Sequence, residues 1–283
     1  PTDLQRLVAA IRQAATDLGL PAQPVPWLDP LPTFVPSHTL PMPTGAETSV
    51  GLGMIDLPEA QSQVAWEFDP ARDGHLVVFG ASGSGKSTLL RTLAVQFANR
   101  LAPGDLEMYV LDFASRSLGS LADLPQCGGV INADEGERID RLFAHLDRTV
   151  AARKRMLGEW GVSSVAEARA SGRSMPYVVV MIDGFANFYS TYQMVDHGDL
   201  VDRFLKLLSD GRTSGVFFVV TGDRRNAVPS SVTSLMSARL VMRMGEPDEY
   251  VSLGLSGDLG RIDIAPGRGF TVSKQEVQVA VSG

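Results

Sequence analysis

The amino-acid sequence predicts an α/β fold with a mainly parallel central sheet that is flanked by helices on both faces. Short, continuously apolar segments alternate along the chain with longer segments whose apolar residues recur at helical spacing. Strands that are buried on both faces and joined by crossover helices give this pattern. A glycine-rich loop lies between the first of these strands and the first of these helices, and such a turn is suited to binding an anion.

The strands and helices of this core can be assigned to residues. Short apolar runs predict strands at residues 76–79, 108–111, 177–182, 216–220 and 239–244. Helical spacing predicts helices over residues 86–100, over 139–150 with Asp134 at the start, and over 200–208. Residues 254–269 are expected to form a loop.

The part of the chain before the core has a different pattern. Residues 3–19 have apolar residues at helical spacing and predict an amphipathic helix. Eight prolines between residues 21 and 43 then predict an extended strap, which we expect to be anchored by Trp27, Leu28, Leu31 and Phe34. Residues 50–70 suggest an edge strand and a hairpin. We therefore divide the chain into residues 1–49, a helix and strap that pack on the core, and residues 50–283, the core domain.

Composition excludes several classes of protein. With 44% hydrophobic residues, a net charge of −7 and Cys127 as the only cysteine, the chain is neither disordered nor a disulfide scaffold. The acidic balance disfavours a general nucleic-acid-binding role. The longest apolar run, residues 177–182, is too short to cross a membrane, which takes about 18 apolar residues or more. Because the chain begins at Pro1 and lacks a signal-peptide pattern, we interpret it as part of a longer protein.

The glycine-rich loop matches the phosphate-binding P-loop, and its position between a strand and a helix is the one the mechanism requires. Backbone N–H groups of such a loop surround phosphate oxygens, while Lys86 would reach the terminal phosphates of ATP and Ser87 would ligate Mg²⁺. The expected ligands are therefore ATP and Mg²⁺. The predicted nucleotide-binding residues are Gly80, Ala81, Ser82, Gly83, Ser84, Gly85, Lys86, Ser87 and Thr88.

A carboxylate ends the buried strand at residues 177–182, which is how P-loop proteins hold Mg²⁺ from the far side of the loop. Asp183 is thus the predicted catalytic and metal-site residue, together with Ser87 as a metal ligand. A helix or turn cap is the alternative role for Asp183.

Hydrolysis usually needs a further carboxylate that polarises water, but the neighbour of Asp183 is Gly184. The sequence therefore predicts slow or absent turnover, unless Asp112, Asp223 or another chain supplies the base. A Gly184→Glu substitution is expected to raise turnover.

Three further residues are candidates for contact with the γ-phosphate. Arg212 precedes the strand at 216–220 and is a candidate catalytic arginine finger toward a neighbouring subunit, with a solvated surface arginine as the equal alternative. Thr221 and Asp223 follow that strand and could sense the γ-phosphate, or simply form a turn.

These residues together resemble the FtsK/SpoIIIE family of motor ATPases, and more closely the tandem ATPase domains of EccC-type proteins from type VII secretion systems. Asp183 followed by Gly184 is similar to the middle, or second, ATPase domain. The resemblance covers nearly the whole chain and includes the first helix, the P-loop, the Asp183–Gly184 pair, Pro26-Trp27-Leu28-Asp29-Pro30-Leu31-Pro32, the segment from Gly51-Leu52-Gly53 to Gln63, Val110-Leu111-Asp112-Phe113 and Pro266-Gly267-Arg268-Gly269.

The resemblance implies a RecA-like fold, ATP and Mg²⁺ as ligands, and assembly into a ring with sister ATPase domains of the same chain and of neighbouring subunits. It also implies export substrates of the WXG helical-hairpin type, and a cytoplasmic location tethered to the membrane through other parts of the full-length protein. Two departures from the family pattern, Ala114 in place of lysine and Asp223 in place of glutamine, suggest with Gly184 a degenerate site.

Three functions follow from these observations. The first is an ATP-binding domain of a secretion motor with impaired hydrolysis. The second is an active DNA translocase, which the acidic charge and the missing base disfavour. The third is a module that docks partners and whose nucleotide site is vestigial.

Overall fold

The computed structural model describes residues 2–20 and 27–282 of the chain. These residues form two compact units. One unit takes in the residues before Leu31 together with Pro58–Ser62, and the other comprises Leu31–Leu57 and the residues from Gln63 onward. Residues 21–26, which are the start of the predicted strap and include Pro26, lie outside the described residues. The predicted division of the chain after residue 49 stays a prediction.

The first unit contains the predicted N-terminal helix, α1 (Asp3–Asp17). Thr2 and Gln5 form a capping box at its start, in which the Thr2 hydroxyl accepts from the Gln5 N–H and the Gln5 side chain accepts from the Thr2 N–H. No residue of α1 is buried, and its apolar residues Leu4, Leu7 and Ile11 are exposed. The same unit includes a 3₁₀ turn, η2 (Pro58–Ala60).

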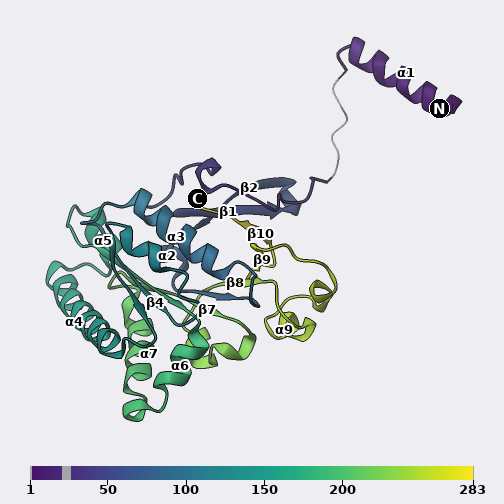
Figure 1. The fold of residues 1–283 in the computed structure, drawn as a ribbon. Coiled ribbons are helices and arrows are strands. Elements are labelled where there is room, and N and C mark those ends of the chain that lie inside the picture. Colours follow the sequence, from purple (N-terminus) through teal and green to yellow (C-terminus); the bar gives the residue numbers. More distant parts are fainter. Residues whose placement is uncertain (1, 21–26, 283) are drawn as a thin grey trace. The chain divides into compact units, whose positions relative to one another are not determined.

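The second unit is built around a sheet whose ten strands, among the described residues, lie in the order β2-β1-β10-β9-β8-β3-β7-β6-β4-β5 (Figure 1). The strands are β1 (Val50–Leu57), β2 (Ser62–Phe68), β3 (Leu76–Phe79), β4 (Leu106–Asp112), β5 (Cys127–Asn132), β6 (Tyr177–Asp183), β7 (Val216–Gly222), β8 (Ala238–Met242), β9 (Arg268–Thr271) and β10 (Glu276–Val279).

The run β8-β3-β7-β6-β4-β5 is parallel throughout, whereas β8-β9, β9-β10 and β10-β1 are antiparallel pairs. The predicted mainly parallel sheet is confirmed, and the expected hairpin over residues 50–70 is β1 and β2. Three strands escaped prediction: β5, β9 and β10. Residues 254–269 are therefore not wholly a loop, because β9 begins at Arg268.

Helices cover both faces of the parallel strands, as expected. In Figure 1, α3 and α5 lie on one side of the sheet and α4, α6 and α7 on the other. Alternate strand residues divide accordingly: Val77 and Phe79 pack in a core with α4, α6 and α7, whereas Leu76 and Val78 pack with α3 and α5. The helices of this unit are α2 (Pro70–Asp73), α3 (Lys86–Arg100), α4 (Gly136–Trp160), α5 (Val165–Ala170), α6 (Phe185–Tyr192), α7 (Asp199–Gly211), α8 (Ser230–Thr233) and α9 (Pro247–Ser252).

Short 3₁₀ helices complete the unit: η1 (Ser37–Thr39), η3 (Gly119–Asp123), η4 (Val195–Gly198), η5 (Arg225–Ala227) and η6 (Gly257–Arg261). The start of α4 differs from the expectation. Its N-cap is Glu135 rather than Asp134, and the Asp134 carboxylate accepts a hydrogen bond of 2.8 Å from Arg116. No helix in the described part of the chain is long and apolar enough to cross a membrane.

Of the predicted anchors of the strap, Leu31 is buried as expected, and Val35, which was not predicted, is buried as well. The other three, Trp27, Leu28 and Phe34, are exposed. The reason lies in the backbone: residues near Val35 run beside the end of the chain, with the Val281 N–H donating to the Val35 carbonyl at 2.8 Å and the Ser37 N–H to the Val281 carbonyl at 2.9 Å. In such an extended chain neighbouring side chains point to opposite sides, so Phe34 faces away when Val35 faces the core.

Candidate nucleotide-binding site

The loop between β3 and α3 is held in shape by its own backbone and by its neighbours. Gly80 N–H donates to the Gly222 carbonyl at 3.0 Å and Ala81 N–H to the Arg243 carbonyl at 2.7 Å. Gly85 has a φ of +110°, and a Cβ there would lie 2.9 Å from the Gly267 nitrogen. Both observations explain why residue 85 is a glycine, because a side chain there would need an unfavourable backbone conformation and a displaced neighbouring loop.

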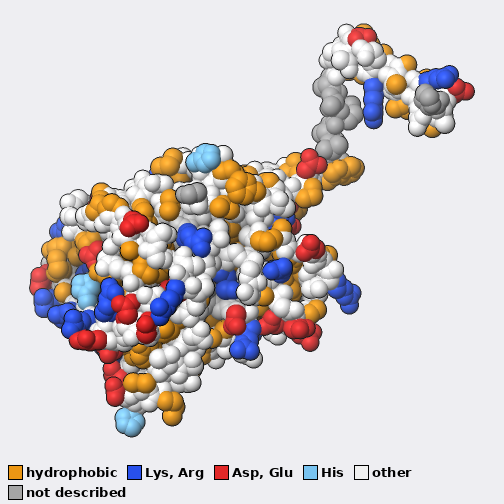
Figure 2. All heavy atoms as spheres, viewed as in Figure 1, with side chains coloured by type: hydrophobic (Ala, Val, Ile, Leu, Met, Phe, Trp, Pro, Cys, Tyr) orange, Lys and Arg blue, Asp and Glu red, His pale blue; other side chains and the backbone are white. Residues whose placement is uncertain are grey.

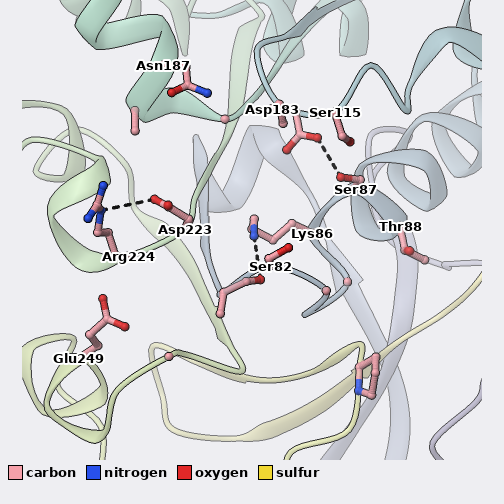
Figure 3. Close-up of a pocket in the computed structure, with 18 of the residues that line it drawn as sticks. Ser82, Lys86, Ser87, Thr88, Ser115, Asp183, Asn187, Asp223, Arg224 and Glu249 are labelled. Atoms are coloured by element: carbon pink, nitrogen blue, oxygen red, sulfur yellow. Dashed lines mark hydrogen bonds and ion pairs between the residues drawn. The ribbon is translucent and has the colours of Figure 1, made fainter.

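Lys86 lies at the first position of α3, and its side chain turns back into the loop. Its ammonium donates to the carbonyl oxygens of Gly80 and Ala81, the latter at 3.0 Å. Burial lowers the pKa of Lys86, and the negative charges of Asp183 and Asp223 oppose this effect. The ammonium thus occupies the loop that would surround a phosphate, beside two carboxylates (Figure 3).

Ser87 and Asp183 meet across the loop, as the sequence predicts for a magnesium site. The Ser87 hydroxyl donates to one oxygen of Asp183 at 2.8 Å, and the Thr221 hydroxyl donates to the other at 2.6 Å. Asp183 is only 1% exposed. One carboxylate and one hydroxyl fit Mg²⁺ bound mainly through phosphates and water, which is how proteins usually hold this ion. Within the described residues, no cluster of three or more His, Cys, Asp or Glu could form an all-protein metal cage.

These residues line a cleft of about 760 Å³ at the carboxyl ends of the parallel strands. Most of the predicted loop residues lie at this cleft, including Thr88, and Asp223 and Arg224 lie opposite (Figure 3). A volume of this size is typical of sites for small-molecule ligands. Lining residues that sequence reasoning missed are Ser115, Ala186, Asn187, Gly245, Glu246 and Glu249.

Some of the missed cleft-lining residues could have been found from their positions in the sequence. Ser115 follows the strand that ends at Asp112, and Asn187 lies one turn into the helix that follows Asp183; both are positions just beyond strand ends, where sites of this fold form. Asn187 donates to the Phe113 carbonyl at 2.8 Å. Glu246 and Glu249 had the same kind of signal, because they follow the strand predicted at residues 239–244 and Glu249 lies in the first turn of α9.

The backbone at Gly184 has a conformation that favours glycine. Its φ is +80°, and a Cβ would lie 3.0 Å from the Phe113 carbonyl oxygen and 3.1 Å from the Ala114 nitrogen. Its N–H donates to the Thr221 hydroxyl at 2.9 Å. A Gly184→Glu substitution would therefore strain the backbone instead of simply adding a carboxylate, so the expected rise in turnover is not a clean test of the missing base.

The first alternative source of a base, Asp112, is committed elsewhere. Its carboxylate accepts from the N–H groups of Ala114 and Arg116 at 3.1 Å each, and from that of Leu118 at 3.2 Å. It is buried and does not line the cleft. Asp112 thus folds the loop after β4 and is not placed to activate water.

The two residues at the end of β7 differ in position. The Thr221 hydroxyl is buried between Asp183 and the Gly184 N–H, where it holds the metal-site carboxylate and does not face the cleft. Asp223 lines the cleft and is exposed, with Arg224 3.8 Å away. Of the candidate bases in this chain, Asp223 is the one that the fold brings to the cleft.

Arg212 lies away from this cleft, at the amino edge of the parallel strands. Its guanidinium donates to the Arg72 carbonyl at 2.6 Å, and it lines a separate depression with Tyr177 and Phe217. The structure therefore does not bring Arg212 to Lys86 and Asp183 of the same chain. Its action on a neighbouring subunit stays a prediction.

Comparison with protein families gives a match to the FtsK/SpoIIIE family over residues 40–263. The chain is 27% identical over 253 residues to the ESX secretion system protein YukB of Bacillus subtilis, and 28% identical over 273 residues to the ESX secretion system protein EccC of Geobacillus thermodenitrificans. These alignments cover 89% and 94% of this chain but 16% and 18% of the relatives. The chain thus spans less than a fifth of the length of these relatives.

Solved structures agree with these matches. Thermomonospora curvata EccC (ATPases 2 and 3), in complex with a signal sequence peptide, is 26% identical with a TM-score of 0.78, over 90% of this chain and 49% of that one. EssC (ATPases 2 and 3) from Geobacillus thermodenitrificans is 26% identical with a TM-score of 0.77, over 90% of this chain and 48% of that one. The predicted RecA-like P-loop fold and the predicted relationship to EccC-type ATPase domains are confirmed.

Proposed function

Because the chain belongs to the FtsK/SpoIIIE family and is similar to ATPase domains of type VII secretion proteins, we propose that it binds ATP with Mg²⁺ as one ATPase domain of such a secretion protein. The observation that carries the proposal is the geometry around Lys86, Ser87 and Asp183, in which a shaped phosphate loop faces a hydroxyl and a carboxylate. The sequence pair Asp183–Gly184 supports assignment to the middle ATPase domain.

In this proposal each element of the site has one task. The N–H groups of the loop and the start of α3 bind phosphate oxygens, and Lys86 leaves the carbonyls of Gly80 and Ala81 to reach the terminal phosphates. Ser87 and Asp183 hold Mg²⁺, directly or through its water. The ion supplies charge neutralisation on the phosphates.

Hydrolysis is weak in this proposal because the chain does not present a well-placed base. Gly184 has no side chain, and the Asp112 carboxylate is saturated by backbone N–H groups. Loss of general-base help typically slows a reaction by about 10²- to 10⁴-fold. Of the two alternative bases named from the sequence, Asp223 is the one that lines the cleft and could restore part of it.

We further infer that the domain works in the cytoplasm, tethered to the membrane by other parts of a longer protein, and assembles with sister ATPase domains in a ring. Its substrates would be WXG-type helical hairpins; the similar Thermomonospora curvata structure contains a signal sequence peptide. DNA translocation is disfavoured by the net charge of −7. On the face shown in Figure 2, acidic and basic side chains are intermixed over α4, where Arg138 pairs with Glu135 and Arg141 with Glu137.

Calorimetric titration of ATP and Mg²⁺ into the protein tests the proposal. The wild type should bind saturably, and Lys86→Ala should weaken binding by about 100-fold or more, because the loop loses its only charge directed at the phosphates. Lys206→Ala, which removes an exposed lysine on α7, is the matched control and should bind like the wild type. Circular dichroism would check that each variant is folded.

Two results would contradict the proposal. If the wild type does not bind, the site is vestigial and the chain acts as a docking module; if Lys86→Ala binds equally well, ATP is not bound through the phosphate loop. Phosphate release should be slow in the same samples. Turnover of about 1 per second or faster, within the usual range of competent enzymes, would contradict the inference of weak hydrolysis.

A further inference from the structure

Residues 31–37, which we call the docked segment, are tied to the phosphate loop through Arg268 and Gly267. Arg268 is 9% exposed, and its side chain contacts the docked segment. Its guanidinium donates to the Leu31 carbonyl at 2.6 Å, to the Pro32 carbonyl at 3.3 Å and to the Gln278 side chain at 2.9 Å, and it pairs with Glu276. The docked segment therefore supplies two of the acceptors of a largely buried cation.

The residue before Arg268 contacts the phosphate loop itself. Gly267 N–H donates to the Ser84 carbonyl at 2.7 Å, and its nitrogen lies so close to Gly85 that a Cβ there would be 2.9 Å away. Pro266, one residue earlier, lines the cleft. Because these are contacts between two backbones, a shift of Gly267 cannot be absorbed by a side-chain rotation and must move the loop between Ser84 and Gly85.

A second route joins the docked segment to the helix that follows the loop. Val281 N–H donates to the Val35 carbonyl, and the preceding residue, Ala280, accepts a hydrogen bond of 2.7 Å from the Thr92 hydroxyl on α3. Gln96, one turn further along α3, donates to the Ser37 carbonyl at 3.4 Å. The docked segment thus bears on the helix whose first residues are Lys86 and Ser87.

If the docked segment leaves, the guanidinium of Arg268 loses two backbone acceptors and the residues that cover it on that side. A charged donor that loses its partners is destabilised, so Arg268 would move to regain partners. Since Gly267 is its chain neighbour, that movement reaches Ser84 and Gly85. By thermodynamic reciprocity, a ligand that fixes the phosphate loop must also favour the docked state of the segment.

We propose that docking of residues 31–37 and nucleotide binding at the phosphate loop are coupled through Gly267 and Arg268, with Arg268 acting as a positioning residue for the nucleotide site. The inference rests on the proposed function, because it requires that ATP binds at the loop. The docked segment connects directly to the residues that precede Leu31 in the chain. Coupling at this point would let the state of that preceding region set the affinity of the domain for ATP.

The test compares the same substitution, arginine to lysine, at two buried arginines. Arg268→Lys keeps the charge but cannot reach both Leu31 and Gln278, and it should weaken Mg-ATP binding by about tenfold, within the usual range of coupling between sites. Arg153→Lys is the matched control, because Arg153 is also buried (6% exposed) and donates to a backbone carbonyl, that of Ser214, at 2.8 Å. It should bind Mg-ATP like the wild type.

Hydrogen exchange gives a second readout that does not depend on a variant being folded. In the wild type, Mg-ATP should slow exchange of the Ser37 and Val281 N–H groups, which hold the docked segment to the end of the chain. In Arg268→Lys this slowing should be lost or much reduced at saturating Mg-ATP. A purely structural role for Arg268 would change the basal exchange rate without changing the response to ATP.

The outcomes separate the two proposals. If the wild type does not bind Mg-ATP, the proposed function fails and the coupling fails with it. If the wild type binds but Mg-ATP leaves exchange at Ser37 and Val281 unchanged, or if Arg268→Lys matches the wild type in affinity, only the coupling is overturned.

Discussion

Polar side chains lie at both ends of the parallel strands, which we call the carboxyl edge and the amino edge of the sheet, but their hydrogen-bond partners differ. At the carboxyl edge, the hydroxyls of Ser87 and Thr221 donate to the Asp183 carboxylate beside an open cleft. At the amino edge, His75 and Arg153 bond to backbone groups of neighbouring elements. The partners of His75 and Arg153 belong to the backbone and are fixed by the fold, whereas the side chains around Asp183 are paired with one another and can exchange a partner for a ligand.

The difference implies that substitutions at the amino edge change stability, and that those at the carboxyl edge change ligand binding. The largest expected effect concerns His75, which is 2% exposed. Its Nδ1 accepts from the Phe218 N–H at 3.0 Å and its Nε2 donates to the Leu208 carbonyl at 2.8 Å, so the ring must be neutral. Burial lowers the pKa of His75 to about 4.

Because this pKa lies below that of an unfolded histidine, about 6.5, the unfolded chain takes up the proton first as the pH falls. The stabilising contribution of neutral His75 is therefore complete above pH of about 6.5 and is lost progressively down to about 4, which amounts to about 3 kcal/mol. Urea unfolding across this range should show the loss in the wild type and its absence in His75→Gln. His197→Gln, at an exposed histidine, should retain it; equal pH dependence in all three would refute the assignment.

At the carboxyl edge, Asp183→Asn keeps the size of the side chain but removes the charge that Mg²⁺ requires. The gain in ATP affinity on adding Mg²⁺ should fall by about 10- to 100-fold, which calorimetry with and without the ion would measure. Asp112→Asn is a stringent control at the same edge, because its carboxylate binds only backbone N–H groups and should affect stability instead. An unchanged response to Mg²⁺ in Asp183→Asn would remove Asp183 from the metal site.

Thr221 combines both behaviours, since its hydroxyl donates to the Asp183 carboxylate and accepts from the Gly184 N–H. Thr221→Val preserves the shape but leaves a buried carboxylate oxygen and a buried N–H without these partners, which should cost about 1 to 2 kcal/mol of stability in urea unfolding. ATP affinity should fall less than in Asp183→Asn. Thr191→Val, which removes an exposed hydroxyl on α6, should be neutral within about 0.5 kcal/mol.

The smallest effect is expected for Arg212. Its hydrogen bonds to the backbone are at an exposed site, so Arg212→Ala should change stability by less than about 0.5 kcal/mol. The affinity of the single chain for ATP should not change, because Arg212 lies at the amino edge. A clear loss of affinity in the monomeric variant would show that the two edges are not independent.

The sequence was sufficient for those parts of the fold that depend on local pattern. All the parallel strands except β5 contain continuous apolar runs, and the phosphate loop is specified by consecutive residues, so both could be predicted. Strand β5 contains Gly128 and Gly129, and β10 contains Glu276 and Gln278, so neither has a continuous apolar run; their pairing is set by distant parts of the chain.

The site, like the fold, could be predicted only where it depends on residues close together in the sequence. Lys86, Ser87 and Asp183 belong to local motifs and meet as expected. The contact of Arg268 with Leu31, and the choice of Val35 over Phe34 as an anchor, depend on how distant segments pack, which residue spacing does not encode. Arg212 stays a candidate for contact with a neighbouring subunit; within this chain its position just before a strand puts it at the end of the strands opposite the phosphate loop.

The backbone at Gly184 also bears on how such a domain can evolve. A Cβ at this position would lie 3.0 Å from the Phe113 carbonyl oxygen and 3.1 Å from the Ala114 nitrogen, and main-chain atoms cannot be made smaller by mutation. A carboxylate at residue 184 would therefore require a rearrangement of the loop after β4 as well as the substitution itself. A base at a position that already lines the cleft, such as Asp223, requires no such second change.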